Sequence, residues 1–131
     1  MTQRYGIDTS VLVRLITGAP PDAYAHCVNR LSALVVGGAE IFASNQVIGE
    51  AFVAVRHHYG VAAVDARSEL SKALRSGLVA PLNGRAAFEA LEASGGPGLF
   101  DRLIADDYTR RGLAILTLDR KMAGLPDVRP L

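Results

Sequence analysis

Short apolar segments that alternate with longer helical patterns constrain the fold of this 131-residue chain most strongly. The segments typical of strands are residues 5–7, 41–43, 78–82, 114–118 and 128–131. The helical patterns cover residues 10–17, 22–36, 46–59, 64–76, 85–93 and 100–111. This order predicts an α/β fold whose parallel strands are joined by right-handed crossovers. Pro81 places the third strand near an edge, and the length favours a single domain over residues 1–131.

Helix starts are marked by small polar side chains that can accept a hydrogen bond from the first helical turn. We expect Thr9 or Ser10 to cap the first helix and Asp22 to cap the second. Ser44 or Asn45 is expected to cap the third helix. Glycines close most of these patterns, as is typical of helix ends.

Charge and cysteine content exclude several classes of protein. The formal net charge is +1, so the chain has no global signal for polyanion binding. The single Cys27 cannot form an internal disulfide, which fits a cytoplasmic protein, and we expect it to pack in the core. The most apolar stretch, residues 31–43, is interrupted by polar and glycine residues and is shorter than a membrane span. Asp8 and Arg14 fall where a signal peptide would be apolar.

Two aspartates follow strands. Asp8 comes directly after the first predicted strand, and Asp119 follows the apolar run at residues 114–118, which we expect to be buried. Because the carboxyl ends of parallel strands share one edge of a sheet, Asp8 and Asp119 should lie on the same edge, close together if their strands are neighbours. The alternative for Asp8 is a purely structural one, as the cap or turn former of the next helix.

Two further carboxylates lie on helices. Glu50 sits among the apolar residues of the third helix, where a carboxylate is costly unless it is paired or bound to a metal. Asp101 lies in the first turn of the last helix, where the helix dipole favours an anion. The alternatives are a boundary glutamate that points to water and an aspartate that only serves the dipole. Asp106 and Asp107 fall on other faces of that helix and are expected to be solvated.

Four carboxylates projected onto one end of a sheet indicate a cation site. Carboxylates that lie close together repel, so such a group persists mainly to hold a hard cation. Oxygen ligands alone select Mg²⁺ or Mn²⁺ over zinc. The chemistry that follows is metal-assisted hydrolysis of a phosphodiester.

Four motifs resemble those of the PIN-domain ribonucleases, and specifically the VapC-like toxins of bacterial toxin–antitoxin pairs. These motifs are Tyr5–Leu12, Asn45–Glu50, Phe100–Ala105 and Leu116–Arg120. Their order and spacing also resemble the family, with 42 residues from Asp8 to Glu50, 51 more to Asp101 and 18 more to Asp119. The resemblance covers nearly the whole chain.

The resemblance implies a three-layer PIN-like fold with a five-stranded parallel sheet between helices. It also implies a Mg²⁺-dependent endoribonuclease that forms a homodimer and is blocked by a cognate antitoxin. Asp8 and Asp101 resemble the direct metal ligands, while Glu50 and Asp119 resemble the acids that complete the pocket. Thr117 resembles a polar position beside the site. The chain departs from the family at Asp106, where relatives commonly carry a small apolar residue.

Basic residues near the same edge are candidates for RNA contact. They are Arg14, Arg120 and Lys121, with Arg110 and Arg111 at the end of the last helix. Each of them is equally well explained as part of a solvated charged face. His57 lies two turns after Glu50, and we expect a surface histidine there.

Other readings of the acidic residues remain. An aspartyl phosphatase usually has a second Asp two residues after the first, where this chain has Ser10, and a receiver domain needs paired acids after its first strand. Both classes are disfavoured. A catalytically inactive PIN-fold protein-interaction module is the remaining alternative, and the presence of all four acids argues against it.

Overall fold

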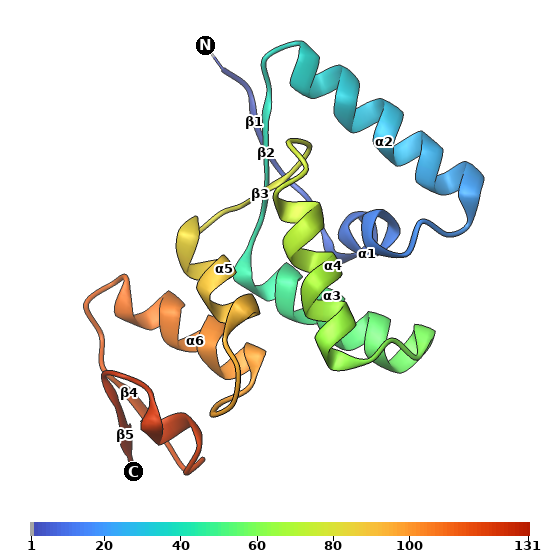
Figure 1. The fold of residues 1–131 in the computed structure, drawn as a ribbon. Helices are drawn as coiled ribbons and strands as arrows, with labels where there is room; N and C mark the ends of the chain where they lie inside the picture. Colours follow the sequence, from blue (N-terminus) through green and yellow to red (C-terminus); the bar gives the residue numbers. More distant parts are fainter. Residues whose placement is uncertain (1) are drawn as a thin grey trace.

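The computed structural model describes residues 2–131 as short strands that alternate with helices (Figure 1). The strands are β1 (Arg4–Gly6), β2 (Glu40–Ala43), β3 (Ala80–Pro81), β4 (Ile115–Thr117) and β5 (Val128–Pro130). The helices are α1 (Thr9–Thr17), α2 (Pro21–Val36), α3 (Asn45–Tyr59), α4 (Ala63–Leu74), α5 (Arg85–Glu92) and α6 (Leu99–Thr109). A 3₁₀ turn, η1 (Met122–Gly124), was not predicted. The α/β alternation and all six predicted helices are confirmed.

The five strands form two parallel sheets and not the single sheet that was expected. One sheet has the order β1-β2-β3, with Tyr5 opposite Ile41 and Phe42 opposite Ala80. The other pairs β4 with β5, and Ile115 lies opposite Val128. Figure 1 shows the second sheet at the far end of the molecule from the first. β3 is an edge strand of its sheet, as Pro81 predicts.

The strands that precede Asp8 and Asp119 are more exposed than their apolar sequences indicate. All three residues of β1 are exposed, and Tyr5 retains 41% of its accessible surface. Ile115 is buried, but Leu116 is 64% and Leu118 is 85% exposed. The prediction of a buried strand before Asp119 is therefore wrong for Leu116 and Leu118, which are exposed, whereas Ile115 packs in a core cluster.

Two apolar clusters hold the chain together. The larger joins all six helices to the three-stranded sheet, and its fully buried members include Leu12, Ile48 and Leu70. The smaller packs Ala105 of α6 against Ile115, Met122 and Val128. The site residues at the starts of α1, α3 and α6 are thus fixed by the larger cluster, while Asp119 belongs to the part that the smaller cluster holds.

The helix caps differ in part from those predicted. Asp8 caps α1, so neither Thr9 nor Ser10 does. No side chain caps α2, which begins with Pro21 at its first position, where the missing N–H costs nothing. Ser44 caps α3 by accepting a hydrogen bond from the Val47 N–H at 3.2 Å, as expected.

Cys27 is a free, half-buried thiol on α2. Within residues 2–131, no helix combines the length and the apolar character that a membrane crossing requires.

Two substitutions on α4 test where the core lies. Leu70 is fully buried, so Leu70→Ala should reduce the free energy of unfolding by about 2–5 kcal/mol through lost burial and the cavity it leaves. Val64 lies on the same helix and is 72% exposed, so Val64→Ala should change stability by no more than about 0.5 kcal/mol. Urea denaturation measures both, and equal effects would contradict this assignment of the core.

Candidate functional site

Asp8 combines a structural role with a free oxygen. Its Oδ1 accepts hydrogen bonds from the Ser10 hydroxyl and from the Val11 N–H at 3.3 Å. These bonds, with that from Ser10 the stronger cause, lower the pKa of Asp8, so its carboxylate is ionised at neutral pH. The cap occupies Oδ1 alone, and no residue in the described range 2–131 donates a hydrogen bond to Oδ2. Capping therefore leaves an oxygen free for a ligand.

Glu50 is tied to the residue that follows Asp8. It accepts a hydrogen bond from the Thr9 hydroxyl at 2.8 Å and one from the Gln46 side-chain amide at 3.1 Å. The bond from Gln46 and then that from Thr9 lower the pKa of Glu50. The side chain is exposed, so Glu50 is a boundary glutamate that points to water, which was the alternative for this residue. Through Thr9, the start of α1 and the second turn of α3 bring Asp8 and Glu50 to one region.

Asp101 and Asp119 form the other acidic pair. Asp101 lies half-buried in the first turn of α6. Burial, and then the nearby charge of Asp119, raise the pKa of Asp101. Asp119 Oδ1 accepts hydrogen bonds from the backbone N–H groups of Lys121 at 2.8 Å and Met122 at 3.1 Å. These bonds hold the Asp119 carboxylate at the start of the turn that leads into η1.

The four acids thus form two pairs, Asp8 with Glu50 and Asp101 with Asp119. No group of three or more histidine, cysteine or acidic side chains lies within metal-binding reach in the part of the chain that the structure describes. The donor chemistry nevertheless fits a hard cation, because every candidate ligand is a carboxylate oxygen. The charge of Asp119 beside the half-buried Asp101 is a repulsion that a cation would relieve.

Several other predicted residues have visible roles. Thr117 contacts Asp119 through the backbone, since its hydroxyl oxygen accepts the Asp119 N–H at 2.9 Å. Arg14 donates to the Ala19 carbonyl at 2.9 Å and so holds the turn between α1 and α2. Arg120 and Lys121 are exposed beside Asp119. His57 is exposed on α3, as expected.

Asp106 is the centre of a hydrogen-bonded network and is not merely solvated, which corrects the prediction. Its carboxylate accepts from the side chains of Asn45, Asn83 and Arg110, with an ion pair to Arg110 at 2.9 Å. Burial alone would raise the pKa of Asp106, but these hydrogen bonds outweigh it and lower the pKa. Asp107 is exposed and also accepts from Asn45 and Asn83.

Asn45 is the residue that the sequence analysis missed, because it was considered only as a possible cap. It is 3% exposed, and its Nδ2 donates to the Leu103 carbonyl at 2.9 Å as well as to the two aspartates. It therefore ties the start of α3 to the second half of α6. Its Oδ1 is buried without a hydrogen-bond partner. In the sequence, the only sign of this role is that an asparagine stands at the first position of a helix.

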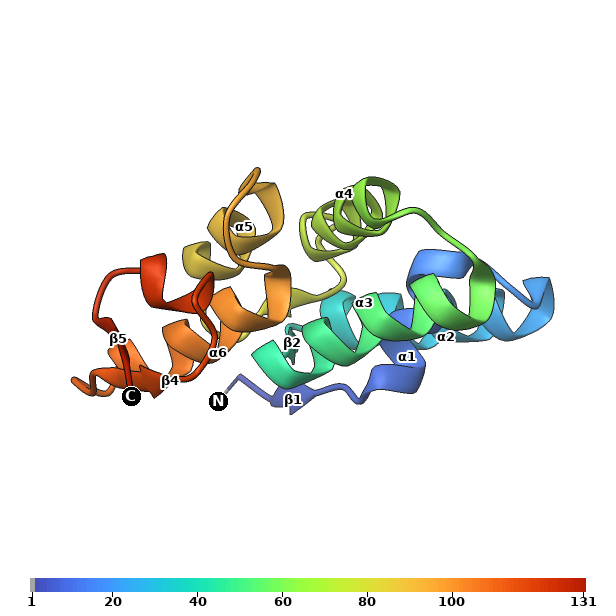
Figure 2. The same cartoon turned by 90° about the horizontal axis from the view of Figure 1, so that it is seen from below.

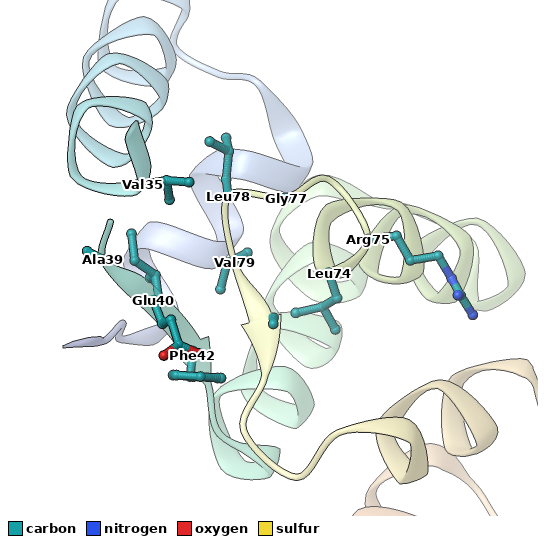
Figure 3. A pocket seen from close by; sticks show the side chains of 11 residues that line it. Val35, Ala39, Glu40, Phe42, Leu74, Arg75, Gly77, Leu78 and Val79 are labelled. Atoms are coloured by element: carbon teal, nitrogen blue, oxygen red, sulfur yellow. The ribbon is translucent and has the colours of Figure 1, made fainter. Parts of the chain in front are cut away.

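Two grooves flank these elements at opposite ends of the strands. One, of about 320 Å³, is lined by Glu50 and Gln46 on α3 and by Phe100, Ile104 and Asp107 on α6. The other, of about 330 Å³, lies between the ends of α2 and α4 and the strands β2 and β3 (Figure 3). None of the predicted site residues lines this second groove. Of the four predicted acids, Glu50 lines the first groove.

The Asp106 network yields a test of stability. Asp106→Asn removes the charge that Arg110 pairs with and places a third amide against those of Asn45 and Asn83, so the free energy of unfolding at pH 7 should fall by about 1.5–3 kcal/mol. Because the folded-state pKa of Asp106 is lowered, its contribution is complete above the ordinary aspartate pKa and is lost as the pH falls through the folded-state pKa. The difference between wild type and variant should therefore shrink below about pH 4.

Glu89→Gln is the matched control for that experiment. Glu89 also faces an arginine four residues away, Arg85, but the side chains of this pair are 91% and 70% exposed. Its loss should cost no more than about 0.5 kcal/mol. If Asp106→Asn lowered the free energy of unfolding as little as the control does, the network would contribute nothing to stability.

Comparison with known proteins bears on this geometry. The model of the PIN domain family matches residues 5–128. A search of curated proteins finds no match. The matched range includes all four acids and covers nearly the whole chain. The chain therefore belongs to the PIN domain family, whose members are typically metal-dependent nucleases.

Proposed function

We propose that this protein is a Mg²⁺-dependent endoribonuclease and the toxin of a VapC-like toxin–antitoxin pair. The observation that carries the proposal is the half-buried Asp101, whose pKa is raised by burial and by the charge of Asp119. A scaffold gains nothing from two carboxylates that repel one another, whereas a cation turns that repulsion into binding energy. Mn²⁺ has the same preference for oxygen ligands and should substitute.

Each acid has a proposed part in this site. Asp8 and Asp101 are the direct metal ligands, and Asp8 offers the oxygen that its cap leaves free. Glu50 and Asp119 complete the pocket, and both are already oriented, Glu50 by Thr9 and Gln46 and Asp119 by backbone N–H groups. The cation, when bound, supplies an acidified water and neutralises charge on the phosphodiester. Arg14, Arg120 and Lys121 are proposed contacts to RNA phosphates.

The active arrangement, we propose, is a five-stranded sheet in which β4 lies beside β1. β1 is at the edge of its sheet, and β4 pairs with β5 alone. The apolar side chains of Tyr5, Leu116 and Leu118 are exposed, and pairing of these two strands would bury them. It would also bring Asp119 to the end of the sheet where Asp8 stands, and so join the two acidic pairs.

The partners follow from the toxin proposal. They are the RNA substrate, a cognate antitoxin protein and a second copy of the chain in a homodimer, in the cytoplasm. An arginine of the antitoxin is well suited to neutralise an all-carboxylate pocket. The alternative proposal, a catalytically inactive PIN-fold interaction module, predicts neither metal binding nor cleavage.

Asp8→Asn tests the metal site. Asparagine caps helices about as well as aspartate, so the fold should be kept. Mg²⁺ should raise the melting temperature of the wild type by mass action and that of the variant much less at the same concentration. The wild type should cleave single-stranded RNA only with Mg²⁺ or Mn²⁺, and Asp8→Asn should not cleave it. A variant that keeps both responses would exclude Asp8 from the site.

The same pair of proteins tests the toxin role. Expression of the wild type should arrest growth, Asp8→Asn should not, and the product of the adjacent gene should bind the toxin and relieve the arrest. Cleavage without growth arrest would leave a nuclease that is not a toxin.

Leu116→Ala tests the proposed sheet. If β4 joins β1, Leu116 becomes buried, and the substitution should cost about 2 kcal/mol or more in the presence of Mg²⁺. Val36 on α2 is 87% exposed, so Val36→Ala is the control and should cost no more than about 0.5 kcal/mol. Equal, small losses for both variants with saturating Mg²⁺ would mean that β4 stays exposed.

A further inference from the structure

Gly49 lies within α3, where a glycine weakens a helix relative to alanine. The structure accounts for this cost. A Cβ added to Gly49 would come within 2.9 Å of three ring carbons of Phe100, far inside van der Waals contact. The aromatic ring thus occupies the space that any other side chain would need, and α6 approaches α3 more closely than it otherwise could.

This contact lies between helices that run in opposite directions. Asn45, at the start of α3, reaches Leu103 and Asp106 in α6, whereas Gly49, one turn later, meets Phe100, which precedes them. Figures 1 and 2 show that α3 and α6 start close to one another and run in opposite directions. The contact is therefore anchored on one side by a buried amide and on the other by close packing of the ring.

The antiparallel contact determines where the next residue of each helix points. Each residue of a helix is turned by about 100° from the one before it. In two antiparallel helices, the residues that follow a contact position turn toward the same side of the pair. Glu50 follows Gly49, and Asp101 follows Phe100, so both carboxylates emerge on one side. The Phe100 ring also lines the groove beside Glu50.

We infer that Gly49 and Phe100 are positioning residues, whose contact sets the separation of Glu50 and Asp101 and thereby the affinity of the proposed site for a divalent cation. The inference rests on the proposed function and extends it to two residues that carry no charge. Gly49→Ala should push α6 away from α3 and move Asp101 relative to Glu50.

The test measures binding of Mn²⁺ alone, by calorimetry or by electron paramagnetic resonance, with no RNA present. Gly49→Ala should weaken binding by about tenfold or more, the scale on which residues that orient metal ligands act. The double variant Gly49→Ala/Phe100→Leu should recover most of the affinity lost in Gly49→Ala, since the smaller side chain makes room for the new methyl group. Gly37→Ala is the control, because a Cβ there meets only carbonyl oxygens at an ordinary 3.4 Å.

The outcomes separate this inference from the proposed function. A wild type that does not bind Mn²⁺ overturns both. Wild-type binding with unchanged affinity in Gly49→Ala overturns the inference alone, whatever happens to the melting temperature. If Gly49→Ala does not fold, Phe100→Trp enlarges the ring on the other side of the same contact and should also weaken Mn²⁺ binding, and unchanged affinity in that variant overturns the inference.

Discussion

The close contact between α3 and α6 is the constraint on which the acidic region depends. α3 carries Glu50 and α6 carries Asp101, and neither carboxylate could hold a reproducible place if these helices were free to slide. Packing of the Phe100 ring against a glycine fixes the distance between the helices, while the buried amide of Asn45 fixes their register. Close packing and directional hydrogen bonds thus act at adjacent turns of the same interface.

The electrostatics of the site follow from how each acid is held. Asp8 and Glu50 accept hydrogen bonds from hydroxyl and amide groups, which stabilise the charged form and lower the pKa. Asp101 has lost part of its hydration and faces the charge of Asp119, so its charged form is disfavoured and its pKa is raised. In the proposed site, a bound cation would relieve the repulsion at Asp101.

The sequence predicts the helices well because their signals are local. Apolar periodicity and glycine stops place them, and the four acids could be singled out in the sequence: Asp8 and Asp119 after strands, Asp101 at a helix start and Glu50 among apolar neighbours. Pairing of strands is not local, and the apolar residues of β4 do not indicate which strand it pairs with. The part of Asn45 was missed for the same reason, since its partners lie 58 to 62 residues away. The network around Asp106 was missed for the same reason, because Asn45 and Asn83 lie 61 and 23 residues away from it.

Pro81 makes the two edges of the three-stranded sheet different. The Leu82 N–H donates to the Ala43 carbonyl, so the neighbouring Pro81 turns its nitrogen, which has no hydrogen, toward the outer side of β3. An added strand would find no donor there, and this side is protected against the edge-to-edge association that makes exposed strands prone to aggregate. The sheet can therefore grow in one direction alone, past β1, and a chain that leaves β1 uncovered is liable to stick to its own copies at that edge.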